Sequence, residues 1–366
     1  MTDPLPLLRR LIEAKSLSHE EGPAAEVVEA ALRDAGCEPR RKQNNVWAAK
    51  GRGGRALLLN SHIDTVPAGP GWTRDPWRGE VDGDRLYGLG STDAKSCVAA
   101  MLAAFVEAPD PGERGRLVFC ASAGEEVGGE EGLARVLADG DLGPLEMAVV
   151  GEPTAFGVCH SQRGRVVAVL VAEGKAGHAS RPWQGVNAID IAARDILKLD
   201  ELRMQASGGG FTATPSLDET LPDPGLPVTV QATVISGGTR SNVIPERCEV
   251  TLDIRTTTLH PNRWAIDTLR KLVASRVLVR SAACEPVFTM PDAPIVRAGL
   301  RAPGTKTASF YGVSDLYHLA SRGVSGIILG PGSGKQSHQA DEFVSISAVR
   351  RAVAVYGSIV EEVFRA

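Results

Sequence analysis

The chain of 366 residues is long enough for two domains, one of which could interrupt the other. Its composition, with 43% hydrophobic residues, 23% charged residues and a net charge of -4, is that of an ordinary globular protein, and the lack of a basic excess excludes nucleic acid as a natural partner. Six scattered cysteines without a CxxC pair argue against a cysteine zinc site, so any metal must bind to His, Asp and Glu.

The N-terminal stretch MTDPLPLLRRLIEAKS predicts an amphipathic surface helix and lacks the apolar core of a signal peptide. The longest apolar runs, such as VVAVLVA and GIILG, are too short to cross a bilayer. We therefore expect a cytoplasmic protein that has no membrane partner.

Four short apolar runs predict buried strands, because each ends in small residues that polar residues follow directly. These runs are ALLLNSHID, RLVFCASAGEE, EMAVVGEP and SGIILGPGSGKQSH, and helix-like segments such as AKSCVAAMLAAFVEA accompany them. The pattern predicts an α/β fold whose open, mixed but mostly parallel sheet has helices on both faces. Ligands of such sheets bind beyond the carboxyl ends of the strands, where the four polar clusters would meet.

The pattern changes between residues 165 and 286, where the order of predicted elements is βαββαβ. This order predicts a smaller α+β domain that interrupts the first one. We therefore expect a catalytic metal-binding domain made of residues 1–164 and 287–366, and a second domain made of residues 165–286. Within the second domain, SGGGFTATPSLDETLPDPGLP is predicted to be a loop.

Two motifs near strand or helix ends could bind metal. His62 and Asp64 in SHIDTVP lie on the same side of the chain, and a carboxylate that holds the second ring nitrogen of a histidine suits a metal ligand. The alternative for His62 is a hydrogen-bonded core histidine. Asp93 in YGLGSTDAK could cap the helix that follows or bridge two cations. Neither motif decides the question alone.

The stretch AGEEVGGEEG contains two glutamate pairs in different settings. Glu125 and Glu126 end a predicted buried strand, where one carboxylate could bind a cation while the other moves protons. Glu130 and Glu131 are predicted to open the helix-like EEGLARVLADG as solvated first-turn residues.

Two further residues complete the candidate set, namely Glu152 in VVGEPT and His338 in GPGSGKQSHQADEF. Together the candidates supply two imidazoles and three carboxylates at one edge of the predicted sheet. Three carboxylates gathered there would be costly, whereas a pair of divalent ions would neutralise them. The predicted ligands are His62, Asp93, Glu126, Glu152 and His338.

Seven segments, in this order and spacing, resemble the dinuclear-zinc deacylase and carboxypeptidase family over nearly the whole chain: SHIDTVP, LYGLGSTDAK, SAGEEVGG, VVGEPT, GKAGHAS, GGTRSNVIPE and SHQADEF. Within the family, the compact length and the residues of GSTDAK, GEPT and SHQADEF are most similar to the acetylornithine deacetylases. Glu152 stands where many aminopeptidase-like members have Asp, which favours an N-acyl substrate. Val313 stands where desuccinylase-like members tend to carry Thr, which weakens the desuccinylase interpretation.

The resemblance implies a role for each candidate at the metal site. It places His62 and Glu152 on one zinc ion and Glu126 and His338 on the other, with Asp93 between the two ions. It also makes Asp64 the partner of the His62 ring and Glu125 the general acid and base. The His and carboxylate ligands would equally accept cobalt or manganese.

The resemblance further implies that residues 165–286 form a lid and the interface of a homodimer. His178 would reach the site of the neighbouring subunit, and Asn242 and Arg255 would hold the substrate, with Arg163 as a further candidate. The residues themselves leave other interpretations open: His178 could be a surface histidine, Arg255 could be solvated, and Asn242 could satisfy backbone groups of a turn.

The predicted function is a metal-dependent amidohydrolase that removes an acetyl or related acyl group from an N-acyl amino acid such as N-acetylornithine. Water between two zinc ions has its pKa lowered to roughly 7, and Glu125 would take its proton and hand it to the departing amine. The alternatives are a succinyl-diaminopimelate desuccinylase-like activity, a metallo-carboxypeptidase or dipeptidase, and, from another class, a catalytically silent metal- or partner-binding protein. The intact Glu125 argues against the last.

Overall fold

The computed structural model describes residues 2–206 and 227–365, so nearly all of the predicted loop SGGGFTATPSLDETLPDPGLP lies outside the described residues. The chain divides into two compact units. The first comprises the chain up to Ser161, Thr289–Phe310 and the chain from Ser314 onward, and the second comprises Gln162–Phe288 and Tyr311–Val313. These boundaries lie within a few residues of positions 164 and 287, apart from the short segment Tyr311–Val313.

The four apolar runs form the centre of the sheet in the first unit. They are β3 (Arg55–His62), β6 (Gly115–Ser122), β7 (Met147–Val150) and β17 (Ser325–Ile328). These strands lie in the order β6-β3-β7-β17, and each neighbouring pair is parallel. The predicted mixed sheet with a parallel centre is therefore confirmed.

Further strands flank this parallel centre, and of these β1, β2 and β8 pair antiparallel with their neighbours. On one side, β2 pairs with β6 and β1 pairs with β2, whereas on the other side β8 pairs with β17 and β16 pairs with β8. The bounds are β1 (Arg40–Lys42), β2 (Asn45–Gly51), β8 (Gly157–Gln162) and β16 (Lys306–Phe310). The strands that carry the polar clusters therefore lie at the centre of the sheet.

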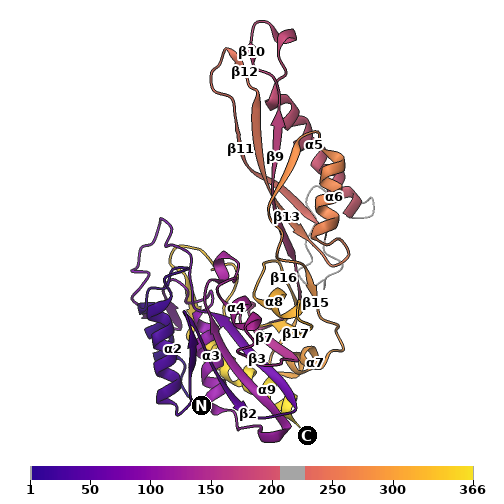
Figure 1. Ribbon diagram of the computed structural model, residues 1–366. Coiled ribbons are helices and arrows are strands. Elements are labelled where there is room, and N and C mark those ends of the chain that lie inside the picture. The colour runs from indigo at the N-terminus through magenta and orange to yellow at the C-terminus, as the bar shows by residue number, and fades with distance from the viewer. Residues whose placement is uncertain (1, 207–226, 366) are drawn as a thin grey trace. The chain divides into compact units, whose positions relative to one another are not determined.

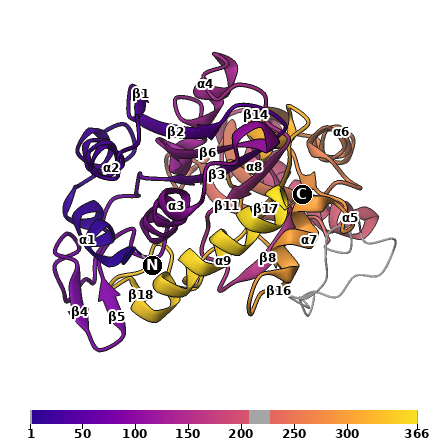
Figure 2. The ribbon, with the colours of Figure 1, turned by 90° about the horizontal axis from the view of Figure 1, so that it is seen from below.

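Helices cover both faces of the sheet, as predicted, and Figure 2 shows α3 and α9 on one face and α4 and α8 on the other. Helix α3 is rich in alanine and is buried from Lys95 to Phe105 among α1, α9 and strand β3. Small side chains allow this close packing on several sides at once. The helices of this unit are α1 (Leu5–Glu13), α2 (Gly22–Asp34), α3 (Lys95–Glu107), α4 (Leu133–Ala138), α7 (Pro294–Arg301), α8 (Leu316–Ala320) and α9 (Ile346–Phe364).

A second, small sheet of the first unit joins the C-terminal part of the chain to the segment before α3. Its strands are β4 (Glu80–Asp82), β5 (Arg85–Tyr87) and β18 (Phe343–Ser345), in the antiparallel order β18-β5-β4. The pairing of β18 with β5 brings the residue before β18, Glu342, beside the loop that leaves β5. Short 3₁₀ turns occur at η1 (Gly112–Arg114) and η2 (Glu125–Val127).

The second unit has the predicted βαββαβ order, and Figure 1 shows its two long helices on one side of its sheet. The strands pair antiparallel in the order β11-β13-β9-β14, and β13 alternates buried and partly exposed residues. Its main elements are β9 (Gly164–Glu173), α5 (Ala188–Ala206), β11 (Thr229–Gly237), β13 (Arg247–Thr256), α6 (Asn262–Leu272) and β14 (Arg276–Ser281). The shorter ones are β10 (Gly177–His178), η3 (Pro182–Gln184), β12 (Val243–Ile244) and β15 (Val287–Phe288).

Within residues 2–206 and 227–365, no helix combines the length and the apolar character that crossing a membrane requires.

Candidate metal centre

The parallel strands deliver polar side chains to one edge of the sheet. His62 is the last residue of β3, Glu125 and Glu126 follow β6, and Glu152 follows β7. Because β6, β3 and β7 are parallel neighbours, these residues leave the sheet at the same edge. The loop before α3 adds Asp93 to the group. His338, from the loop after β17, also belongs to it. The structure thus brings together all five predicted metal ligands and Glu125.

The two carboxylate oxygens of Asp93 face two different histidines. Oδ1 lies 3.3 Å from His62 Nε2, and Oδ2 lies 3.7 Å from His338 Nε2. On the His62 side, Glu152 Oε2 lies 4.0 Å from the same Nε2 atom. On the His338 side, Glu126 Oε1 lies 3.0 Å from His338 Nε2. Asp93 therefore stands between a His62–Glu152 pair and a Glu126–His338 pair.

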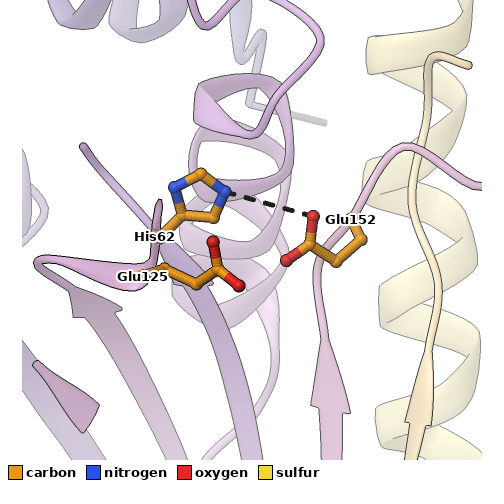
Figure 3. A group of neighbouring side chains, drawn as sticks. All are labelled: His62, Glu125 and Glu152. Carbon is orange, nitrogen blue, oxygen red and sulfur yellow. Dashed lines mark ion pairs between the residues drawn. The ribbon is translucent and has the colours of Figure 1, made fainter. Parts of the chain in front are cut away.

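The geometry also gathers potential ligand atoms closely enough for a cation. Single donor atoms of His62, Asp93 and Glu126 lie within 4.8 Å of one another, and so do those of His62, Glu125 and Glu152. Figure 3 shows the second group, with both glutamates directed toward the imidazole. The distances between possible ligand atoms therefore do not show whether Glu125 binds a metal ion. The hydrogen bonds of Glu125 have to distinguish it from the ligands.

The pKa values of this cluster are shifted in the way that crowded, buried carboxylates shift them. Burial raises the pKa of Glu152 well above its usual value, and burial together with the charge of Glu152 does the same for Glu125. Burial lowers the pKa of His62, but hydrogen bonds to Asp64 and Asp93 outweigh it and raise this pKa overall. The contact with Glu126 raises the pKa of His338 to about 8. Divalent cations would relieve this crowding, and imidazole with carboxylate oxygens is a fitting donor set for them.

Asp93 does not cap the helix that follows it. Helix α3 begins at Lys95, and its N-cap is Ala94, which makes no side-chain capping hydrogen bond. The Asp93 carboxylate is directed to the two histidines instead. His62 in turn is 1% exposed, and its ring nitrogens face the carboxylates of Asp64 and Asp93. Both residues thus belong to one polar cluster at the sheet edge.

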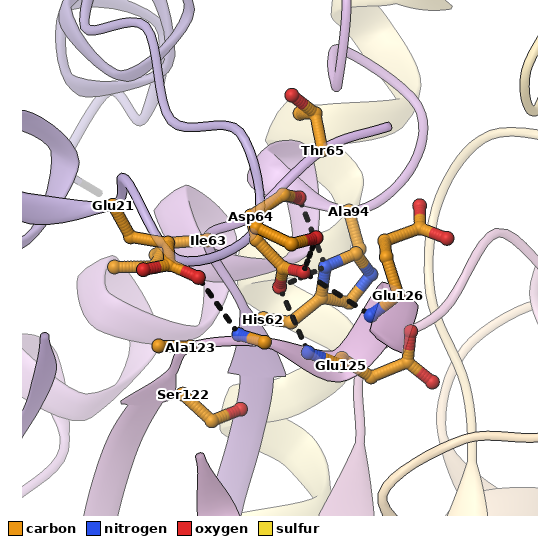
Figure 4. Close-up of polar contacts among 12 residues, drawn as sticks. Glu21, His62, Ile63, Asp64, Thr65, Ala94, Ser122, Ala123, Glu125 and Glu126 are labelled. Atoms are coloured by element: carbon orange, nitrogen blue, oxygen red, sulfur yellow. Dashed lines mark hydrogen bonds and ion pairs between the residues drawn. The ribbon is translucent and has the colours of Figure 1, made fainter. Parts of the chain in front are cut away.

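The turn that carries Glu125 and Glu126 is fixed through its backbone (Figure 4). Gly124 adopts a φ of 65°, which glycine tolerates without strain. Each of the four N–H groups of residues 123–126 donates to a side-chain oxygen. The acceptors, in chain order, are Asn45 Oδ1 at 3.0 Å, Glu21 Oε1 at 3.1 Å, Asp64 Oδ1 at 3.0 Å and Asp64 Oδ2 at 3.1 Å.

Asp64 therefore orients both the imidazole and the glutamate turn. Its Oδ1 lies 3.3 Å from His62 Nδ1, and its Oδ2 also accepts a hydrogen bond from Ser18 Oγ at 2.8 Å. Burial raises the pKa of Asp64, but the hydrogen bond with His62 outweighs burial, so the pKa is lowered overall. An ionised Asp64 can accept all of these bonds at once.

Three buried carboxylates near the centre are not among the functional residues predicted from the sequence. Glu21 holds the N–H of Gly124, Glu342 holds the loop before Asp93, and Asp315 accepts a hydrogen bond from Ser122 Oγ at 2.8 Å. Burial raises the pKa of Asp315 to about 6. Only Glu342 had a signal in the sequence, its position four residues after His338 in SHQADEF.

The second glutamate pair is solvent-exposed, as expected. Glu130 and Glu131 lie in a turn, and Glu131 forms an ion pair with Arg135 at 3.3 Å. The expected position in the first turn of a helix is wrong, because Gly132 is the N-cap and α4 begins only at Leu133.

Two predicted substrate-site residues lie close together in the second unit. His178 pairs with Val243 in the β10–β12 ribbon, and the carbonyl of Asn242 accepts a hydrogen bond from Ala179 N at 3.0 Å. Both side chains are exposed, and His178 Nδ1 lies 2.7 Å from Ser180 Oγ. His178 is thus an exposed imidazole whose Nδ1 atom is engaged by Ser180.

The two predicted arginines are neighbours elsewhere in the second unit. Arg163 is 3% exposed, and its Nη2 donates to the carbonyl of Arg255 at 3.1 Å. The Arg255 guanidinium donates from Nε to Asp253 Oδ1 at 2.7 Å, so it is neutralised by a carboxylate on its own strand. The Arg255 side chain is still 27% exposed, so the solvated alternative stays open beside this ion pair.

Imidazoles and carboxylates gathered at the carboxyl ends of strands in an α/β sheet define a class of metal-dependent hydrolases. The chain belongs to the peptidase family M20/M25/M40, whose profile matches residues 58–362. It is similar to the succinyl-diaminopimelate desuccinylase of Cereibacter sphaeroides, at 29% identity over 99% of each chain. The chain is therefore a hydrolase that acts on amide bonds.

Solved structures show the same fold. An M20 family metallo-carboxypeptidase from Sulfolobus solfataricus superposes with a TM-score of 0.80 at 16% identity, and the match covers all of both chains. A dinuclear metal binding peptidase of the M20 family from Bacillus subtilis has a TM-score of 0.71 at 16% identity, over 100% of this chain and 98% of that one.

Proposed function

We propose that this protein is a dinuclear metal-dependent amidohydrolase that removes an acyl group from an amino group of an amino acid. Zinc is the proposed metal, with cobalt or manganese as substitutes that the same donors accept. Asp93 would bridge the two cations, with His62 and Glu152 on one and Glu126 and His338 on the other. The orientation of the two Asp93 oxygens supports this assignment.

The observation that carries the proposal is the state of Glu125. Its backbone is held by Asp64, yet among the described residues no hydrogen bond restrains its carboxylate, whereas Glu126 contacts His338. Burial and Glu152 raise its pKa above the usual range for a glutamate. A fixed backbone, a free carboxylate and a raised pKa suit a group that accepts and returns a proton near neutral pH.

The bound cations would supply positive charge that acidifies water and polarises the amide carbonyl. Glu125 takes a proton from the attacking water while the water oxygen forms a bond to the carbonyl carbon. The same carboxyl then gives that proton to the departing nitrogen as the carbon–nitrogen bond breaks. The immediate products are a carboxylic acid and a free amine, and the acid then gives its proton to the amine, which leaves a carboxylate and an ammonium group. Glu125 returns to its base form within one cycle.

We infer an N-succinyl diamino acid as the first substrate class to test. A desuccinylase relative that matches along the whole chain supports this class. Among the interpretations of the sequence, it was the alternative to N-acetylornithine, which stays the second candidate. The similarity of GSTDAK, GEPT and SHQADEF to acetylornithine deacetylases supports that second candidate.

Amine release from a panel of substrates tests the function. The panel contains the N-succinyl and N-acetyl forms of diaminopimelate, ornithine and lysine, together with simple dipeptides. We expect release from at least one acylated amino acid, loss of activity after chelation, and recovery with zinc. Activity that is insensitive to chelation would refute the mechanism, and cleavage of dipeptides alone would favour the peptidase alternative.

We further propose that the protein is a homodimer joined through residues 165–286 and that His178 completes the site of the partner. The edge strand β11 supports this proposal, because Val234 and Ile235 on it are 60% and 57% exposed. Exposed apolar side chains on an open strand edge favour association with another chain. Sedimentation of the intact protein tests the dimer, and a monomer at micromolar concentration would refute it.

A further inference from the structure

One carboxylate outside the ligand set holds most of the backbone that leads to Asp93. Glu342 is 1% exposed and immediately precedes β18. Of the six N–H groups of residues 88–93, four donate to Glu342. Gly88 N donates to its carbonyl at 2.9 Å, Gly90 N to Oε2 at 3.0 Å, Thr92 N to Oε1 at 2.7 Å and Asp93 N to Oε1 at 3.0 Å.

This backbone has few other means of staying in place. Residues 88–94 form neither helix nor strand, and Gly88 and Gly90 adopt positive φ angles of 154° and 79°. Residues 89–92 are buried, so their N–H groups need acceptors within the protein. The remaining N–H groups of the loop donate to Pro76 and Gly88 carbonyls, and the Thr92 hydroxyl donates to the carbonyl of Phe343 at 2.6 Å. The loop is thus attached to the segment around Glu342 by both backbone and side chains.

The attachment matters for the geometry of the cluster. The Asp93 N–H is one of the groups that Glu342 holds, and the Asp93 carboxylate must present one oxygen to the His62 side and the other to the His338 side. Glu342 also lies four residues after His338 on the same segment. Glu342 thus links the Asp93 loop to the chain segment that also carries His338.

We propose that Glu342 is a positioning residue that fixes Asp93 between the two cation sites and thereby raises the affinity for the second of the two cations. This inference rests on the proposed function, because it takes Asp93 as the bridging ligand. Partners behind metal ligands commonly contribute ten- to a hundredfold in metal affinity, so an effect of about that size is expected.

Glu342→Gln is the variant that tests the proposal, because it keeps the size of the side chain. A carboxamide has one acceptor oxygen, so its NH2 group must face either the Gly90 N–H or the N–H groups of Thr92 and Asp93. Metal-free protein is titrated with Co²⁺ and with Zn²⁺ in competition with a chromophoric chelator. We expect the weaker of the two sites to lose about ten- to a hundredfold in affinity and the visible spectrum of bound Co²⁺ to change.

Asp341→Asn is the matched control. Asp341 also accepts three hydrogen bonds from a neighbouring loop, from Thr73 N at 2.9 Å, Thr73 Oγ1 at 2.7 Å and Arg74 N at 3.1 Å, but that loop carries no candidate ligand. This variant should bind both ions as the unchanged protein does, with the same Co²⁺ spectrum. An equal loss in both variants would mean that general loosening, rather than the position of Asp93, lowers the affinity, and the proposal would be overturned.

Two further outcomes are distinguishable. Two ions bound by Glu342→Gln with unchanged affinities would overturn the role of Glu342 and leave the proposed function intact, whereas an unchanged protein that binds fewer than two ions would overturn the proposed function itself. If Glu342→Gln fails to fold, Glu342→Asp replaces it. Aspartate keeps the charge, but its side chain is too short to reach the backbone N–H groups of Gly90, Thr92 and Asp93 together. Its second-site affinity should then also fall, and an unchanged affinity would contradict the proposal.

Discussion

Replacement of Asp64 by Asn should loosen the glutamate turn without removing any predicted metal ligand. Asp64 accepts the N–H groups of Glu125 and Glu126 with its two oxygens, at 3.0 and 3.1 Å. An asparagine has a single acceptor oxygen, so one of these N–H groups would face an NH2 group. A buried N–H without an acceptor costs about 1–3 kcal/mol. At one factor of ten per 1.4 kcal/mol, local opening of the turn would become about five- to 150-fold more frequent.

Hydrogen exchange of the metal-free protein measures this opening directly. Exchange is followed by mass spectrometry in a peptide that covers residues 123–126, and it should accelerate by the same factor in Asp64→Asn. Ser18→Ala serves as the control, because it removes only the hydroxyl that donates to Asp64 Oδ2 and leaves both backbone bonds in place. Equal exchange in the unchanged protein and in Asp64→Asn would refute the claim that this carboxylate fixes the turn.

Three other outcomes are expected. Glu125→Gln should lower kcat about 10²- to 10⁴-fold while metal content stays full, whereas the exposed Glu130→Gln should leave kcat and metal content unchanged; similar kcat values in the two variants would remove Glu125 from proton transfer. His178→Ala should lower turnover at full metal content, and normal turnover would sink the proposed role of His178 in the partner's site. Burial lowers the pKa of His318 to about 4, below its value of about 6.5 in the unfolded chain, so between these values the unfolded chain binds a proton that the folded chain does not. Stability should therefore fall as the pH drops from about 6.5 to 4, and His318→Asn should flatten the fall in thermal midpoint; parallel curves would contradict it.

The strand ends were predictable because the sequence records them locally. An apolar run followed by small and then polar residues identifies β3, β6 and β7. The candidates His62, Glu126 and Glu152 lie at or just after the ends of these strands. The mixed sheet and the βαββαβ order of the second unit come from the same local periodicity. These features depend on residues that are adjacent in the chain, so no knowledge of tertiary contacts is needed.

The supporting carboxylates could not be predicted in this way. Glu21 holds the N–H of a residue 103 positions away, and Glu342 holds that of Asp93 across 249 positions. Their partners are backbone groups, which every residue carries, so no side-chain pattern reveals the pairing. The start of α4 at Leu133 differs from the prediction because Gly132 adopts a non-helical conformation, with φ of -92° and ψ of -126°, so the helix begins only after it.

The long separation between Glu342 and Asp93 also bears on how the protein is made. A chain emerging from the ribosome folds from its N-terminus, and its first parts can acquire structure before the last are synthesised. His62, Glu126 and Glu152 would then be present early, but the loop with Asp93 lacks its main acceptor until residue 342 has emerged. The proposed metal centre is therefore completed late in synthesis, and a nascent or C-terminally truncated chain that lacks residue 342 should bind metal poorly and be inactive.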